Sequence, residues 1–127
     1  MMTRPRMSLL ETVIVTLAVA AACALPVASG APPTPSLELA VASAPGDALT
    51  FVPDAISAPA RTLVRVHFQN GSSQAHNLTF QAPISAATQT IVEPGASAMA
   101  TFVTPGPGSY AFVCTIHIGM AGTLTVE

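Results

Sequence analysis

Three residues near the end of the sequence carry side chains that could bind one metal ion. Cys114, His117 and Met120 follow one another at intervals of three residues in the stretch YAFVCTIHIGMAGTLTVE. A thiolate, an imidazole and a thioether are soft or borderline donors, which suit copper better than Mg²⁺ or Ca²⁺. Zinc accepts cysteine and histidine but rarely methionine. The three side chains together therefore predict a copper site.

One more histidine is needed for a trigonal copper site, in which two histidines and a cysteine bind with a weak axial methionine. His67 lies in an alternating strand pattern, on the face opposite the apolar residues, so we expect it to face solvent. His76 follows the turn-forming residues NGSS at 70–73, where a side chain can reach into the end of a β-barrel. We therefore choose His76 as the fourth ligand, with Asn77 beside it as a brace for the cysteine loop.

The spacing of the three residues also predicts the elements that must position them. Taken singly, a cysteine or methionine is usually a core residue and a lone histidine is usually at the surface. In a regular strand, positions 114, 117 and 120 would alternate between the two faces. They can converge only if the chain leaves the strand after Cys114, and Gly119 and Gly122 favour such a loop. We expect a strand, a ligand-bearing loop and a second strand.

The rest of the domain shows short alternating segments that are typical of β-strands. Examples are LELAVAS at 37–43 and TLVRVHFQ at 62–69, and the 12 prolines and 8 glycines of the chain supply turns. The segment APISAATQT at 82–90 is ambiguous between a loop and a helical turn. We expect an all-β fold of seven to eight strands, a small antiparallel Greek-key sandwich or barrel over residues 37–127.

The composition excludes one class of function. The chain has 127 residues, of which 50% are hydrophobic and 8% are charged, and it contains no lysine. Two of its four arginines lie within the first six residues, which leaves Arg61 and Arg65 in the body of the chain. A nucleic-acid-binding protein needs a basic face that meets phosphates. We therefore exclude nucleic acid as a partner.

Residues 1–30 have the pattern of a segment that directs export. Arg4 and Arg6 precede the apolar run TVIVTLAVAAACAL, as in the charged and hydrophobic regions of a signal peptide. The small residues ASGA at 28–31 offer a cleavage site. The Pro-rich stretch at 31–36 then forms a linker to the domain.

Two alternatives for the N-terminus stay open. One is a lipoprotein in which Cys23 is lipidated, and the other is an uncleaved membrane anchor, although Pro26 makes the span short. All three arrangements place the domain at 37–127 in the periplasm or another extracytoplasmic space. Cleavage or lipidation would leave Cys114 as the sole free thiol in an oxidising compartment, and metal binding would explain its presence.

These residues together resemble the cupredoxins, the type 1 copper family that includes plastocyanin, azurin, pseudoazurin and amicyanin. The matching pieces are HNLTF, VEPGASAMATFVTPGPGSYAFVC and CTIHIGMAGTLTV, which lie within residues 51–127. The resemblance implies copper ligands at His76, Cys114, His117 and Met120. It also implies a hydrogen-bonded link between Asn77 and Thr115. The loop has the short form of amicyanin-like members, but Ile116 and Ile118 stand where those loops carry prolines, which leaves its rigidity open.

The resemblance implies electron transfer as the function. One type 1 copper per chain would pass single electrons between extracytoplasmic redox partners such as a cytochrome, an oxidase or a dehydrogenase. Four protein ligands leave no open position for a substrate, and His67 alone cannot build a second copper site, so we expect no enzymatic activity. We expect a monomer, tethered to a membrane if the N-terminus is retained or lipidated.

Two other functions use the same sequence features differently. A periplasmic copper carrier or store that delivers copper to an oxidase could use the same four ligands. A β-sandwich that serves adhesion or assembly would need no metal, and Cys114→Ser would leave such a function intact.

Overall fold

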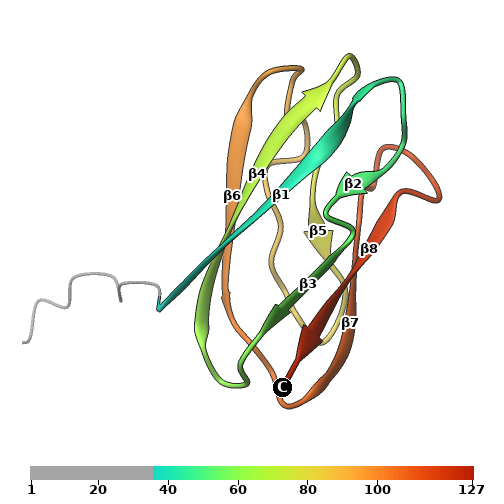
Figure 1. The fold of residues 1–127 in the computed structure, drawn as a ribbon. Coiled ribbons are helices and arrows are strands. Elements are labelled where there is room, and N and C mark those ends of the chain that lie inside the picture. The colour runs from blue at the N-terminus through green and yellow to red at the C-terminus, as the bar shows by residue number, and fades with distance from the viewer. Residues whose placement is uncertain (1–35) are drawn as a thin grey trace, which may run out of the picture. The chain divides into compact units, whose positions relative to one another are not determined.

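Eight β-strands make up the part of the chain that the computed structural model describes, residues 36–127 (Figure 1). They are β1 (Leu37–Gly46), β2 (Phe51–Val52), β3 (Ala55–Ala58), β4 (Leu63–Ser72), β5 (Thr79–Phe80), β6 (Ser97–Val103), β7 (Gly108–Val113) and β8 (Ala121–Val126). The ambiguous segment at 82–90 is irregular, without a helical turn. No helix in the described range is long and apolar enough to span a membrane. The predicted export segment at 1–30 and residues 31–35 of the predicted linker lie outside the described residues.

The strands form two sheets of four, in the orders β2-β1-β4-β6 and β3-β8-β7-β5. Most neighbours are antiparallel, but β1 runs parallel to β4, and β3 runs parallel to β8. The expectation of a wholly antiparallel arrangement is therefore wrong for these two pairs, whereas the all-β Greek-key fold and the number of strands are confirmed. Parallel neighbours need a long connection, and the chain between β1 and β4 passes through β2 and β3 before it returns.

The predicted alternation of β4 is observed and shows which face of the first sheet points inward. Val64, Val66 and Phe68 are buried, whereas His67 and Gln69 are exposed. Because β4 lies between β1 and β6, its buried face contributes to the centre of the core. A strand with one buried face has a fixed register, since a slip of one residue would expose the whole apolar set.

Phenylalanine rings connect the two sheets across the core. Phe51 of β2 lies 5.2 Å from Phe112 of β7, and Phe80 of β5 lies 4.5 Å from Phe102 of β6, measured between ring centroids. Aromatic pairs at such distances add to the stabilisation from burial. The two sheets thus form a fixed frame, and the β4–β5 and β7–β8 connections lie at the same end of it (at the top in Figure 1).

Candidate metal centre

The loop between β7 and β8, residues 114–120, brings three of the predicted ligands into a hydrogen-bonded turn. The Cys114 N–H donates to the carbonyl of Met120 at 3.0 Å, and the Met120 N–H donates to the carbonyl of His117 at 3.3 Å. Gly119 has a φ of 92°, a left-handed conformation that glycine adopts most readily. The chain therefore reverses direction within the loop, and the predicted succession of strand, loop and strand is observed.

His76 reaches the same place from the connection between β4 and β5. Its backbone exchanges two hydrogen bonds with Val92: the His76 N–H donates to the Val92 carbonyl at 3.1 Å, and the reverse bond measures 2.8 Å. The side chain is completely buried. Because His76 lies outside the named strands, this isolated bridge takes the place of a sheet in fixing its backbone.

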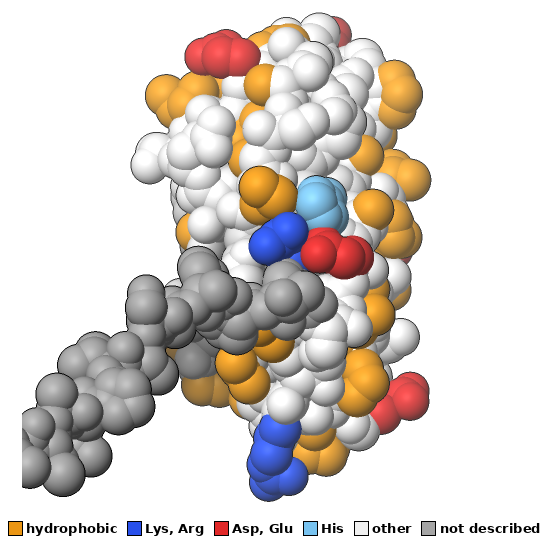
Figure 2. Space-filling view, turned by 90° about the vertical axis from the view of Figure 1, so that its left-hand side faces the viewer, with side chains coloured by type: hydrophobic (Ala, Val, Ile, Leu, Met, Phe, Trp, Pro, Cys, Tyr) orange, Lys and Arg blue, Asp and Glu red, His pale blue; other side chains and the backbone are white. Residues whose placement is uncertain are grey.

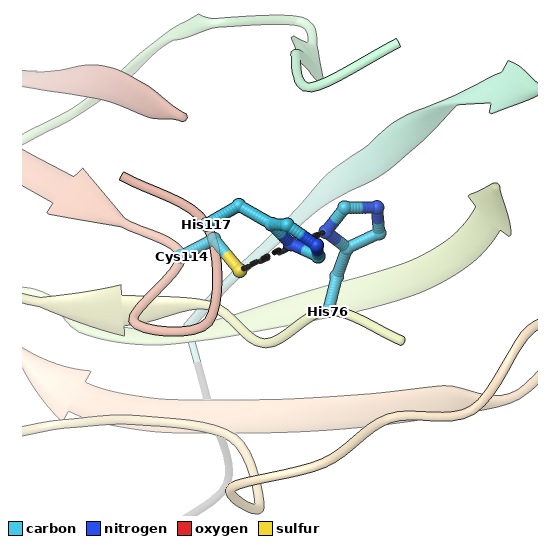
Figure 3. A group of neighbouring side chains, drawn as sticks. All are labelled: His76, Cys114 and His117. Carbon is cyan, nitrogen blue, oxygen red and sulfur yellow. Dashed lines mark hydrogen bonds between the residues drawn. The ribbon is translucent and has the colours of Figure 1, made fainter. Parts of the chain in front are cut away.

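The ligand atoms of His76, Cys114 and His117 converge on one point (Figure 3). Cys114 Sγ lies 3.7 Å from His76 Nδ1 and 3.9 Å from His117 Nδ1, and the two Nδ1 atoms are 3.1 Å apart. A point equidistant from the three atoms lies about 2.1 Å from each, the length of a metal–nitrogen bond and slightly less than that of a metal–thiolate bond. The three side chains therefore fit a trigonally bound metal ion of the size of copper or zinc.

Met120 lies next to this group through its backbone. Its N–H and carbonyl are bonded to His117 and Cys114 respectively, and its side chain is 1% exposed. A buried methionine in the same loop as two of the converging ligands favours copper over zinc, because zinc sites rarely include methionine.

The environment of His76 favours its neutral, metal-binding form. Burial lowers the pKa of His76, and the nearby His117 lowers it further. The Nε2 atom of His76 is also buried without a hydrogen-bond partner in the described part of the chain. A protonated ring would carry its charge into this apolar setting, which is costly, whereas a neutral ring can present the lone pair of Nδ1 to a metal.

Asn77 fixes the position of the cysteine loop. Its side-chain Nδ2 donates to Thr115 Oγ1 at 2.7 Å, and its Oδ1 accepts a bond from the Thr115 N–H at 2.9 Å. Its backbone N–H points to Cys114 Sγ at 3.5 Å. A donor near the cysteine sulfur stabilises negative charge on it, and such bonds are one determinant of the reduction potential of copper–thiolate sites.

Exposed apolar residues stand on both sides of the loop histidine in the sequence. His117 is half-buried, Ile116 is 40% exposed and Ile118 is fully exposed. Large exposed aliphatic side chains that gather in one place are a common sign of an interaction surface. The described structure thus has an apolar surface directly beside one of the converging ligands.

His67 lies away from the metal centre, on the outer face of β4, as its strand pattern predicts. Its ring contacts the carboxylate of Glu38. This carboxylate also forms an ion pair with Arg65, with 3.5 Å between Glu38 Oε1 and Arg65 Nη1. Figure 2 shows this group as one histidine beside a basic and an acidic side chain, on a face with few other charges. All three side chains are substantially exposed, so their ion pairs contribute little to stability.

The role of Val92 was not foreseen from the sequence. It is completely buried and pairs with a ligand residue 16 positions away, in an irregular segment. An isolated bridge between two irregular segments has no periodicity, and no local pattern in the sequence would reveal it.

Comparisons with known proteins place the chain among copper proteins of one fold. A family described as the cupredoxin-like domain matches residues 13–126. Auracyanin-B of Chloroflexus aurantiacus is 32% identical in an alignment that covers 73% of this chain and 53% of that protein. The chain therefore spans about half the length of this curated relative.

Solved structures of copper proteins have a fold similar to that of this chain. The structure of auracyanin B has a TM-score of 0.66 and 30% identity, and the match covers 76% of this chain and 93% of that one. The dithionite-reduced auracyanin of Roseiflexus castenholzii has a TM-score of 0.64 and 26% identity, with coverage of 74% and 99%. Auracyanin A of Chloroflexus aurantiacus, a "blue" copper protein, shares the fold at 20% identity, with a TM-score of 0.61 and coverage of 71% and 98%.

Proposed function

Because this chain belongs to the cupredoxin-like family, we propose that it is a type 1 copper protein that carries single electrons between extracytoplasmic redox partners. The observation that carries the proposal is the convergence of His76 Nδ1, His117 Nδ1 and Cys114 Sγ on one point. These three atoms, together with the thioether of Met120, would hold one copper ion. Bound copper would supply a one-electron couple between Cu(II) and Cu(I).

The protein's contribution is to hold the ligands still while the charge of the site changes. Hydrogen bonds from Asn77 fix the cysteine loop, and the bridge to Val92 fixes His76. A ligand set that does not rearrange keeps the structural cost of each electron transfer small. Since four side chains complete the set, no position is left for a substrate, and we expect no catalytic activity.

Electrons would enter and leave through the exposed edge of His117. The apolar side chains of Ile116 and Ile118 around it would let a partner protein dock close to the metal. From residue 37 onward, two arginines stand against five acidic residues, a net charge of −3. With so few charges, we expect docking to be mainly apolar and electrostatic steering to be weak.

We propose that residues 1–30 direct export, that 31–36 form a linker and that 37–127 form the copper domain. The arginines and the apolar run at the N-terminus support the proposal, as does a buried free cysteine that copper would protect. Mass spectrometry of the native N-terminus distinguishes cleavage near Gly30, lipidation of Cys23 and retention of an anchor. A native protein that is found in the cytoplasm and still begins with Met1 would contradict export.

The direct test of the function is spectroscopy and voltammetry of the purified protein loaded with Cu(II). We expect an intense blue colour from charge transfer between the thiolate and copper, and a reversible one-electron couple. A colourless Cu(II) protein, or one without a reversible couple, would exclude the proposed electron transfer.

A second candidate, a copper carrier or store that supplies an oxidase, draws support from the exposure of the ligand loop. Ile118 is fully exposed, and no proline stiffens the residues on either side of His117. A loop that can open would release copper to an acceptor. Fast transfer of Cu(I) to a chelating acceptor would favour this function, whereas slow, tight retention would favour electron transfer.

A further inference from the structure

Asn70 is a buried amide whose hydrogen-bonding capacity is completely used. It lies in β4 and is 0% exposed. Its Oδ1 accepts bonds from Ser43 Oγ at 2.7 Å and from the Ser72 N–H at 3.0 Å. Its Nδ2 donates to the carbonyls of Gln74 and Val92, both at 2.8 Å. An asparagine amide has two donors and two acceptor positions, so none is left unpaired.

The two bonds that Asn70 donates reach both chain segments that hold His76. Gln74 lies two residues before His76 in the sequence, and Val92 is the partner of His76 in the isolated bridge. The Val92 carbonyl accepts a bond from the His76 N–H at 3.1 Å as well as the bond from Asn70. Asn70 therefore connects β4 directly to the segments on both sides of His76.

We propose that Asn70 is a positioning residue for the metal centre, whose amide fixes the backbone of His76 and thereby the direction of His76 Nδ1. The inference rests on the proposed function. Asn77 bonds to the cysteine loop, whereas Asn70 bonds to the segments around Gln74 and Val92, where His76 has no sheet to hold it. Binding sites require their groups to be held within about 0.5 Å of the productive geometry. Without the amide, His76 would bind copper less tightly, and the balance between Cu(II) and Cu(I) would change.

The test compares Asn70→Ala with Ser43→Ala in the full chain. Ser43 is 2% exposed and belongs to the same network, but its hydroxyl bonds to Asn70 Oδ1 and to the Ser72 N–H, and not to Gln74 or Val92. We expect Asn70→Ala to raise the dissociation constant for copper about tenfold or more, as for other residues that orient a ligand. We also expect a changed visible spectrum, normalised to bound copper, and a changed reduction potential. Ser43→Ala should lower stability alone and keep the spectrum and the potential.

Amide hydrogen exchange in the metal-free protein gives a readout that does not depend on copper. The amides of His76 and Val92 should exchange faster in Asn70→Ala, relative to those of β7, and not in Ser43→Ala. Equal spectra, potentials and relative exchange rates in the two variants would overturn the inference and leave Asn70 a merely structural role. If Asn70→Ala does not fold, Asn70→Ser, whose hydroxyl can donate one bond, is judged by the same criteria. A wild-type protein that binds no copper would refute the proposed function. The exchange rates would still test whether Asn70 fixes the backbone of His76.

Discussion

At the scale of single residues, the three histidines show how environment sets the role of one side-chain type. His76 is completely buried and has a lowered pKa, so it is a neutral nitrogen donor. His117 is half-buried, so part of this ligand residue reaches the surface. His67 is exposed and paired with a carboxylate. Only the first two have ring nitrogens that converge with Cys114 Sγ.

The assignment of the thiolate can be tested against the histidine outside the site. Cys114→Ser should abolish the blue colour of the Cu(II) protein and weaken copper binding, because a hydroxyl is a much poorer copper ligand than a thiolate. His67→Asn is the matched control and should keep the wild-type absorption spectrum. A blue Cys114→Ser protein, or a colourless His67→Asn protein, would contradict the ligand assignment.

The lowered pKa of His76 predicts how the metal-free protein responds to acid. The folded pKa lies below the ordinary value of 6.5. Below pH 6.5 the unfolded chain therefore takes up a proton that the folded protein does not, and the free energy of unfolding falls as the pH falls through this window. Denaturant unfolding of the metal-free protein above and below pH 6.5 measures the slope. His76→Gln should have a flatter slope, and an unchanged slope would show that His76 is not the source of the acid sensitivity.

At the scale of elements, much of the frame could be predicted because it follows from local patterns. The alternation in β4 identified its buried face, and Gly119 after Cys114 indicated a loop. The parallel pairing of β1 with β4 could not be predicted, since it depends on how the whole chain crosses between the sheets. Periodicity shows that a strand has a buried face but does not show which strand lies beside it.

The metal centre also has a part that could be predicted from the sequence and a part that could not. The sequence predicted which residues converge, because the kinds of donor and their spacing in the loop are themselves local. The supports of His76 were not predicted, since Asn70 and Val92 act through the backbone of irregular segments. The pattern NGSS predicts Asn70 as a turn residue, which is wrong, because Asn70 is buried in β4 and its partner Val92 lies 22 residues away.

The prediction that Gly122 belongs to the ligand loop is wrong. The sequence suggested that it helps the loop turn, but it lies in β8, where a Cβ atom would be 2.3 Å from Phe112 Cζ and 2.7 Å from the Asp54 carbonyl. We expect Gly122→Ala to lower the free energy of unfolding by about 1–3 kcal/mol through overpacking. Gly106→Ala, where no atom lies within 4 Å of the added Cβ, should change it by less than about 0.5 kcal/mol. Equal effects in denaturant titrations would contradict the close approach.

At the scale of the described domain, the distribution of charge and apolar surface governs association. The face in Figure 2 carries few charged side chains, and the surface beside His117 is apolar. Electron exchange between oxidised and reduced copies of the protein reports on this surface without the need to know a natural partner. Its rate should depend only weakly on salt concentration.

A charge placed beside His117 should slow this exchange strongly. In Ile118→Asp, docking would bring two like charges together, which we expect to reduce the rate about tenfold or more. Val103→Asp is the matched control, because Val103 is 60% exposed and pairs with Leu63 at the far end of β4 from His76. Line broadening in magnetic resonance spectra of mixtures of the two oxidation states measures the rate. Equal rates in the two variants would contradict docking at His117.

The position of β8 between β3 and β7 has a consequence for the order of events in a cell. All four proposed ligands precede this strand in the chain, so they leave the ribosome before it does. Yet the loop from Cys114 to Met120 is closed only when β8 pairs with both neighbours. We therefore expect a nascent chain that has emerged only as far as Met120 to carry every donor atom without an assembled centre, and metal loading to follow the arrival of residues 121–126.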